Sequence, residues 1–236
     1  MSQLDDPQVV RAQYASEAGL AARKAGYRFA EGPDPREVAF QAIAEARPRR
    51  ILEVGCGEGE LAERMLNELG AEVVAVDQSE RMVELTAARG VDARVGDVQN
   101  LPFADGEFDV AVAAWMLFHV AEIDRALGEL ARVLRPGGRL VAVTNGRDHV
   151  HELYELLGLE RRPSTFDAED ASKLLLRHFT HVHELDAGGW LAFPDRPAAQ
   201  AYVDASRTLA PGWESLPDFD GPLRVRRAPY IFVATK

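Results

Sequence analysis

Cysteine is nearly absent from this chain of 236 residues, which contains Cys56 alone. A single cysteine excludes a disulfide within the chain and fits a reducing compartment. No apolar run approaches the roughly 20 residues that span a membrane, and the first residues, MSQLDD, have neither the basic stretch nor the apolar core of a signal peptide. The sequence therefore predicts a cytoplasmic protein with no membrane association.

Basic residues are in the minority: 27 Lys and Arg stand against 38 Asp and Glu, which gives a formal net charge of −11. A field of that sign repels phosphate backbones, so we expect no nucleic-acid partner. Two basic clusters, at 47–50 and 224–227, are interpreted as solvated strand ends. The sequence gives no indication of an oligomeric state.

The middle of the chain alternates short apolar runs with helical patterns. The predicted strands are 51–54, 73–76, 93–95, 108–113 and 139–144. The predicted helices are 60–69, 79–88 and one that ends at 134, before a Pro-Gly-Gly stop at 135–138. Continuous apolar strands that alternate with helices predict a parallel sheet covered by helices on both faces.

We expect one domain over residues 1–236. Residues 1–46 read as a helical segment, with a helix that starts at 32–35 and runs to 44. Residues 47–146 form the predicted ligand-binding core. Residues 147–236 are predicted to complete the sheet and to shape a substrate site with an insertion, through helices at 167–179 and 198–209 and strands at 182–185 and 228–235.

The turn after the first core strand, 53–59 (EVGCGEG), is rich in glycine. Alternating glycines let the backbone turn sharply and approach a ligand, and ligands in such folds lie beyond the carboxyl ends of the strands. The third glycine comes one residue early for a dinucleotide fingerprint. Glu53, Glu58 and Glu60 would repel a pyrophosphate, but not a ligand with a sulfonium and an ammonium group. This favours S-adenosylmethionine (SAM) over NAD.

Two acids follow later strands. Asp77 lies 20 residues past Gly57, at the end of the second core strand, where a carboxylate can accept hydrogen bonds from ribose hydroxyls. A helix cap is the alternative role for Asp77, but Ser79 is the better capping residue. Asp97, after the third strand, can accept from the exocyclic amine of adenine while a backbone amide reads the ring.

Five segments resemble, in order, the motifs of class I SAM-dependent methyltransferases, and especially the branch of ubiquinone/menaquinone-biosynthesis C-methyltransferases. The segments are 53–59, 76–79, 96–103, 108–110 and 132–138. The resemblance covers about residues 48–145. It implies a Rossmann-like α/β fold, with a seven-stranded, mostly parallel sheet whose last strand, 228–235, is antiparallel.

The resemblance also implies SAM as cofactor and S-adenosylhomocysteine as product. It places the methionine moiety on the glycine loop, the ribose on Asp77, the adenine on Asp97 and Val98, and the sulfonium beside the segment from Ala114. The predicted cofactor-binding residues are Glu53, Gly55, Cys56, Gly57, Asp77, Gln78, Asp97, Val98 and Ala114.

Two substrate classes lack their expected residues. The Asn/Asp-Pro-Pro-Tyr/Phe tetrapeptide of many adenine and glutamine methyltransferases is replaced by AAWM at 113–116. Methylation of a pyrimidine at C5 needs a thiolate, and we interpret Cys56 as a small residue that fits the turn. We therefore expect methyl transfer to O, N or C of a small-molecule metabolite. An RNA or protein methyltransferase and a non-catalytic SAM-binding regulator stay open as alternatives.

His119 is the candidate general base, because it follows the fourth core strand and an unperturbed imidazole has a pKa near 6.5. Packing in the helix start is the alternative. Trp115, His119 and Asn145 are the candidate substrate residues.

Two further histidine pairs, 149/151 and 181/183, lack the cysteine or carboxylate spacing of a metal site. We predict no metal and interpret these histidines as solvated. The aromatic residues Trp190, Phe193, Tyr202 and Trp213 could line a substrate lid or pack in the core.

Overall fold

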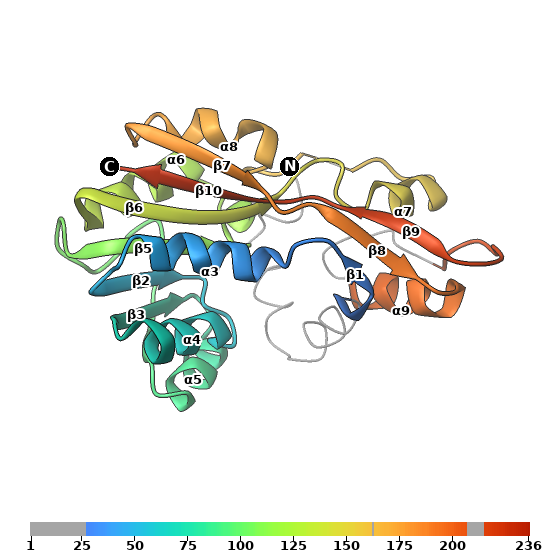
Figure 1. Cartoon of the computed structure of the whole chain (residues 1–236). Coiled ribbons are helices and arrows are strands. Elements are labelled where there is room, and N and C mark those ends of the chain that lie inside the picture. The colour runs from blue at the N-terminus through green and yellow to red at the C-terminus, as the bar shows by residue number, and fades with distance from the viewer. Residues whose placement is uncertain (1–26, 162, 207–214) are drawn as a thin grey trace.

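The computed structural model describes residues 27–161, 163–206 and 215–236, and contains two β-sheets (Figure 1). The larger has seven strands, in the order β4 (Asp92–Val95), β3 (Glu72–Asp77), β2 (Arg50–Val54), β5 (Phe108–Ala114), β6 (Leu134–Asn145), β10 (Pro229–Thr235) and β7 (His181–Asp186). The strands from β4 to β6 pair in parallel, and β10 runs antiparallel to both of its neighbours. The predicted seven-stranded fold with an antiparallel last strand is confirmed.

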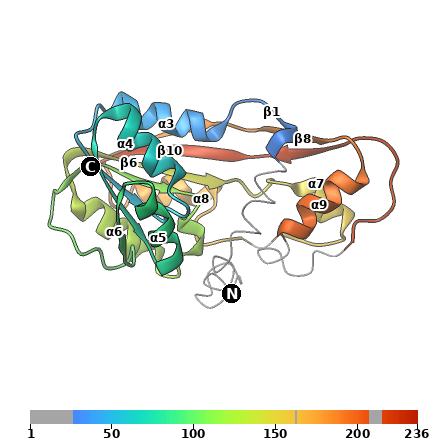
Figure 2. The same ribbon diagram turned by 90° about the horizontal axis from the view of Figure 1, so that it is seen from below.

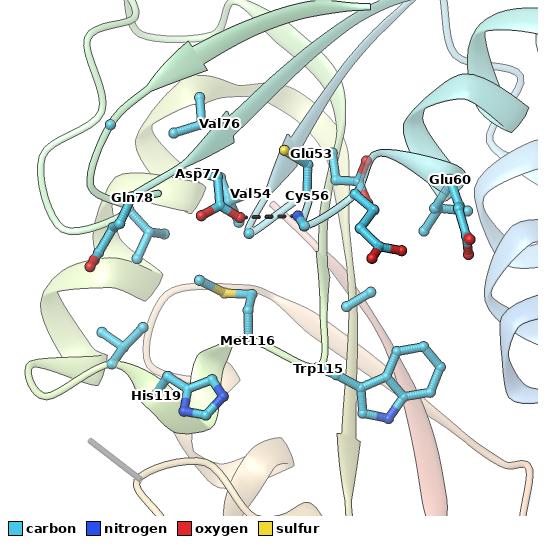
Figure 3. Close-up of a pocket in the computed structure, with 18 of the residues that line it drawn as sticks. Glu53, Val54, Cys56, Glu60, Val76, Asp77, Gln78, Trp115, Met116 and His119 are labelled. Atoms are coloured by element: carbon cyan, nitrogen blue, oxygen red, sulfur yellow. Dashed lines mark hydrogen bonds between the residues drawn. The ribbon is translucent and has the colours of Figure 1, made fainter. Parts of the chain in front are cut away.

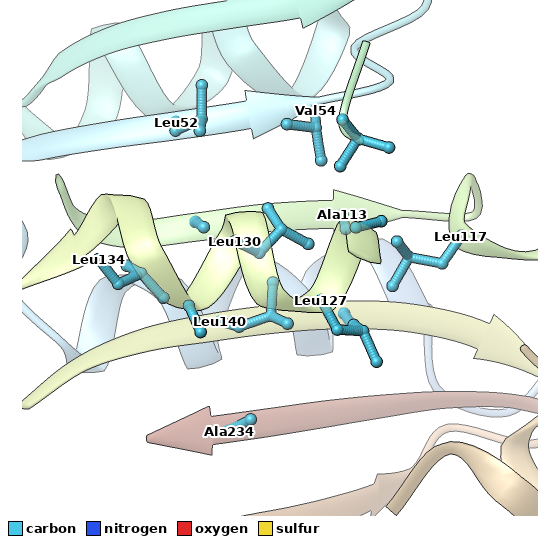
Figure 4. Packing of buried hydrophobic residues seen from close by; sticks show 14 of the residues in the cluster. Leu52, Val54, Ala113, Leu117, Leu127, Leu130, Leu134, Leu140 and Ala234 are labelled. Carbon is cyan, nitrogen blue, oxygen red and sulfur yellow. The ribbon is translucent and has the colours of Figure 1, made fainter. Parts of the chain in front are cut away.

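Helices cover both faces of this sheet because side chains alternate along each strand. Ile51 of β2 packs in the cluster beneath α3 (Pro35–Glu45) and α4 (Glu60–Leu69). Leu52 packs in the opposite cluster, with α6 (Ile123–Val133) and α8 (Ala168–Leu175), as Figure 4 shows for part of that cluster. A fifth helix, α5 (Glu80–Ala88), lies against β3 and β4. Burial of both faces explains why the core strands are continuously apolar.

Capping fixes where two of these helices begin. Asp34 precedes α3 and accepts a hydrogen bond from the Arg36 amide at 2.9 Å. Ser79, the predicted cap of α5, accepts from the Met82 amide at 3.4 Å. A side-chain oxygen at such a position satisfies an amide that has no partner inside the helix.

The predicted helix after β5 is divided into a short 3-10 turn, η3 (Leu117–His119), and α6. The helix ends before the Pro-Gly-Gly segment, as predicted, but this segment does not separate the helix from the strand. Strand β6 begins at Leu134 and includes these residues. Gly137 and Gly138 exchange backbone hydrogen bonds with Lys236 at the other end of the chain. A sequence pattern cannot show such a distant partner.

A second, three-stranded sheet was not predicted. It pairs β1 (Ala30–Glu31), β8 (Gly189–Phe193) and β9 (Leu223–Arg227), all antiparallel. Strand β7 leads almost directly into β8, and β9 into β10, so a long two-stranded ribbon joins the sheets (Figures 1 and 2). The 3-10 turn η2 (Tyr27–Phe29) precedes β1. We call this sheet, with α7 (His151–Leu156) and α9 (Arg196–Ser206), the small lobe.

Other predictions in this part of the chain need correction. The helix expected over 167–179 is shorter, ending at Leu175, and the end of the helix expected over 198–209 lies outside the described residues, as does Trp213. Phe193 and Tyr202 pack in the core of the small lobe, whereas Trp190 contacts the Arg224 guanidinium at 4.7 Å.

The cluster at 224–227 is not a solvated strand end throughout. Arg224 is exposed and pairs with Glu31 at 2.8 Å, but Arg227 is only 1% exposed. The alternation of side chains along β9 turns Arg227 inward, where its Nη2 donates to the Pro33 carbonyl at 2.6 Å.

His149 is likewise not a solvated histidine. The residue is half-buried, and its Nδ1 accepts a hydrogen bond from the Ala228 amide at 3.1 Å. Burial, together with the positive charges of Arg161 and Arg227, lowers the pKa of His149 to about 3. The other three members of the two histidine pairs, His151, His181 and His183, are exposed.

In the described part of the chain, no three His, Cys, Asp or Glu residues are grouped in a way that could hold a metal ion. Within the same ranges, no helix combines the length and apolar character needed to cross a bilayer.

Candidate cofactor site

The glycine loop between β2 and α4 is built on left-handed backbone conformations. Gly55, Gly57 and Gly59 have φ of 68°, 54° and 76°. A Cβ on Gly55 would lie 2.7 Å from the Met116 side chain, and one on Gly59 would lie within 3 Å of Thr86. At Gly55 and Gly59, only glycine combines these backbone angles with such close neighbours. The backbone of the loop can therefore cross the ends of the strands in close contact with Met116 and Thr86.

A cavity of about 530 Å³ opens at this loop, beyond the carboxyl ends of β2, β3 and β5 (Figure 3). Its volume is in the range of small-molecule and cofactor sites. Ten predicted site residues line it: Glu53, Gly55, Cys56, Gly57, Asp77, Gln78, Val98, Ala114, Trp115 and His119. The structure thus brings together residues from four separate sequence segments.

Glu53 is the most buried acidic residue of the cavity wall. It is 3% exposed, and its Oε2 is a buried oxygen with no hydrogen-bond partner, while the Ala62 amide donates to the carboxyl group. The pKa of Glu53 is raised to about 8, mainly by burial and to a smaller extent by the negative charge of Asp77. A cationic group placed at Oε2 would stabilise the ionised carboxylate. The residues present therefore fit the ammonium group of an amino-acid moiety.

Asp77 holds the loop from the neighbouring strand. Its Oδ2 accepts from the Gly57 amide at 3.0 Å, and its Oδ1 accepts from the Ser79 amide at 2.9 Å. Burial raises the pKa of Asp77, although these amides act in the opposite direction. Each carboxylate oxygen has a second lone pair for a ligand hydroxyl. This geometry fits the predicted ribose contact.

Cys56 is buried in the loop, with its Sγ 3.5 Å from the Thr86 hydroxyl. Burial raises the pKa of its thiol to about 12. Because the thiolate is the nucleophilic form, Cys56 is poorly suited to covalent catalysis. Its position agrees with the interpretation as a small residue that fits the turn.

Two predicted residues do not line the cavity. The Asp97 carboxylate accepts hydrogen bonds from the Gln99 amide at 2.9 Å and from the Gln99 side chain at 3.1 Å. Gly96, Val98 and Gln99 form this part of the wall instead. Asn145 stands behind the wall, and its Oδ1 accepts from Trp115 Nε1 at 3.4 Å. The direct ligand contacts proposed for Asp97 and Asn145 stay predictions.

Trp115, Met116 and His119 form the wall opposite the glycine loop (Figure 3). His119 closes η3, half-buried, with its ring centroid 4.4 Å from that of Phe118. Its place beside the loop is compatible with a base that acts on a bound acceptor, and equally with packing.

Sequence reasoning missed two cavity-lining arginines, Arg36 and Arg64. Arg64 is bound by Glu37 at 2.8 Å and by Glu68 at 3.0 Å. Arg36, at the start of α3, has its Asp34 partner 3.8 Å away and is 47% exposed. The Pro35-Arg36 helix start was readable in the sequence, but its position beside the glycine loop depends on tertiary packing.

The fold is a Rossmann-like α/β domain. Its cavity lies at the carboxyl edge of the sheet, beside the glycine loop, and is lined by several acidic residues. Comparison with known proteins gives the family. Residues 52–142 match the family described as "Methyltransferase domain". This match agrees with the resemblance of the sequence motifs to class I SAM-dependent methyltransferases.

Named relatives agree with this assignment. A demethylmenaquinone methyltransferase of Thermus thermophilus is 42% identical over 116 residues, which is 46% of this chain and 52% of that protein. A ubiquinone/menaquinone biosynthesis C-methyltransferase of Dinoroseobacter shibae is 40% identical over 110 residues, 43% of this chain and 44% of the relative. The chain thus spans about half the length of the curated relatives it matches.

Solved structures share the fold. One is a SAM-dependent methyltransferase of Thermotoga maritima, described as a possible histamine N-methyltransferase. It is 23% identical, has a TM-score of 0.57, and the match covers 89% of this chain and 91% of that one. Since the identity is low, this likeness concerns the fold alone.

Proposed function

We propose that the chain is an enzyme that transfers a methyl group from SAM to O, N or C of a small-molecule metabolite. The observation that carries this proposal is the buried Glu53 carboxyl, whose Oε2 lacks a partner at the cavity wall beside Asp77. A buried acidic oxygen of this kind is costly without a partner. The ammonium group at the amino-acid end of SAM supplies one.

Three side chains would hold the cofactor. Glu53 would accept from the ammonium group, and Asp77 would accept from the ribose hydroxyls. Arg36 would bind the α-carboxylate, since its contact with Asp34 is long and its guanidinium is half-exposed at the cavity. Gln78 and Val98 line the remaining part, which we assign to the adenine.

When bound, SAM supplies an activated methyl group on a positively charged sulfur. The protein would align the acceptor atom behind that methyl group and exclude water, which provides much of the rate enhancement in such transfers. His119 would accept the proton that a hydroxyl, amine or carbon acid loses as its new bond to the methyl carbon forms.

A small-molecule acceptor is favoured over RNA by the net charge of −11. One relative is named as a C-methyltransferase, and the structural neighbour is described as a possible histamine N-methyltransferase. The acceptor atom therefore has to come from experiment. A cytoplasmic location stays a prediction, supported by the single, buried cysteine.

Ligand-dependent melting tests the cofactor first. SAM and S-adenosylhomocysteine should raise the melting temperature, whereas NAD and NADP should not, because acids border the loop. Formation of S-adenosylhomocysteine with a metabolite panel, and with tRNA as a separate arm, then tests the reaction. Stabilisation by NAD alone would overturn the cofactor, and turnover with tRNA alone would overturn the substrate class. Binding without turnover on any acceptor would favour the regulatory alternative.

A further inference from the structure

Trp115 has an unusual backbone conformation at the end of β5. Its φ is +53°, in the left-handed region that bulky residues rarely occupy. Side chains of a regular strand alternate between faces, yet Ala114, Trp115 and Met116 all line the cavity. The left-handed residue interrupts the alternation and so turns both large side chains toward the ligand space. Strained backbone of this kind concentrates at functional sites.

The indole is also held in place. Its Nε1 donates to Asn145 Oδ1 at 3.4 Å, and the ring packs against the buried cluster beneath α3. Figure 3 shows Trp115 on the opposite side of the cavity from Glu53. Among the described lining residues, Trp115 is the only Phe, Tyr or Trp. The cavity therefore has one fixed aromatic surface, and it faces the acidic wall.

Chemistry sets which part of a ligand meets this surface. If Asp77 holds the ribose and Glu53 the ammonium group, the sulfur that joins these two parts of SAM lies between them. Met116 and Trp115 form the opposite wall over that interval (Figure 3). An indole face attracts a cation, more strongly where water is excluded. S-adenosylhomocysteine has a neutral sulfur at the same place.

We propose that Trp115 reads the charge of the sulfonium, so that the site binds SAM in preference to S-adenosylhomocysteine, with Asn145 as a positioning residue for the indole. The inference rests on the proposed function. After methyl transfer the sulfur is a neutral thioether, and the attraction to the indole is lost. The product is then held less tightly than the cofactor, which favours its release.

Calorimetric binding of three ligands tests the inference without an acceptor. The ligands are SAM, S-adenosylhomocysteine and sinefungin, whose ammonium group stands in place of the methylsulfonium. Trp115→Leu should weaken SAM and sinefungin roughly tenfold or more, and S-adenosylhomocysteine less than about twofold. Trp115→Phe keeps an aromatic face and should retain most of the preference. Met116→Leu, the neighbouring control, should change all three affinities in parallel.

Asn145 is tested by the same titrations. Asn145→Ala should lose part of the preference for the two cationic ligands. Asn145→Asp keeps an oxygen acceptor for the indole Nε1 and should retain this preference. Equal weakening of all three ligands in Trp115→Leu would show that the indole only packs, and unchanged affinities would show that it contacts the acceptor instead. Either result overturns the inference. If no ligand binds the unaltered chain, the proposed function itself fails.

Discussion

The seven-stranded sheet and the small lobe are built from different kinds of sequence. Strands β2 and β5 are buried along nearly their whole length, whereas β9 alternates and β1 has two exposed residues. Neighbouring strands of the large sheet are joined mainly through nearby helices. In the small lobe, Ala30 pairs with Leu191, from opposite ends of the chain. The parallel part of the large sheet is therefore specified mainly by local sequence, whereas the small lobe, like the pairing of β10 with β6, depends on long-range contacts.

The division extends to the cavity. Its described lining residues all fall between Asp34 and Ala121, so none belongs to the small lobe. An insertion in 147–236 that shapes the substrate site therefore stays a prediction. We therefore expect cofactor binding to depend on the large sheet, and changes in the small lobe to affect stability more than binding.

The largest effect is expected from His119→Ala. If His119 is a general base, turnover at saturating SAM should fall by roughly 10²–10⁴-fold. SAM affinity should hardly change, because we predict His119 to lie on the acceptor side of the sulfonium. Single-turnover rates beside calorimetric affinities provide the measurement. His151→Ala, in an exposed ion pair with Glu155, is the control and should leave both quantities unaltered. A small loss of rate that follows stability would leave His119 with a packing role only.

A smaller effect is expected from Asp77→Ala. Hydrogen bonds to a charged acceptor are worth roughly 1.5–3 kcal/mol each, so SAM affinity should fall at least tenfold. The matched variant is Asp97→Ala, which removes another half-buried carboxylate, one that does not line the cavity. Calorimetry should show little change for it. A large loss in Asp97→Ala would restore the predicted adenine contact, and unchanged affinity in Asp77→Ala would contradict the ribose contact.

The same division explains what the sequence could predict. The glycine spacing, Asp77 and the apolar strands are local patterns with a direct physical meaning, and they located the sheet, the loop and most of the cavity wall. Strand β1 is two residues long, and Arg36 precedes the first core strand. Neither has a local signal for its role, because each depends on which distant segment lies beside it.

Local sequence patterns also could not predict which ionisable side chains are buried. From the sequence alone, the three glutamates around the loop are expected to be ionised. In the structure Glu53 is buried, and the pKa of its carboxyl group is raised. Arg227 is buried and His149 is half-buried, because alternation along β9 and the loop after β6 turn these side chains inward. Composition and charge patterns cannot distinguish such residues from solvated neighbours.

A third prediction concerns pH. The ordinary pKa of 4.5 applies to Glu53 in the unfolded chain, whereas the folded value is about 8, so the folded state binds the extra proton between these limits. Stability should therefore fall as pH rises through this window, by at most about 1.4 kcal/mol per unit. If the Glu53 carboxylate binds the ammonium group as proposed, SAM should bind up to about tenfold more tightly per pH unit from about pH 6 to about pH 7.5. Glu53→Gln should lose both slopes in denaturant unfolding and calorimetry. Identical slopes in the two proteins would mean that another group titrates.

The smallest effect on binding is expected in the small lobe, from Gly189→Ala. A Cβ at Gly189 would lie 2.1 Å from the Glu31 carbonyl oxygen, so β8 and β1 would have to separate. Unfolding free energy should fall by about 1–3 kcal/mol, the usual range for overpacking, with hydrogen exchange accelerated mainly in β8 and β9. SAM affinity should stay within about twofold. The control is Gly128→Ala in α6, where a Cβ meets His178 at an ordinary 3.5 Å and the helix should gain roughly 0.5–1 kcal/mol. A tenfold loss of SAM affinity in Gly189→Ala would show that the small lobe and the cofactor site are coupled. That result would contradict the expectation that the two regions act independently.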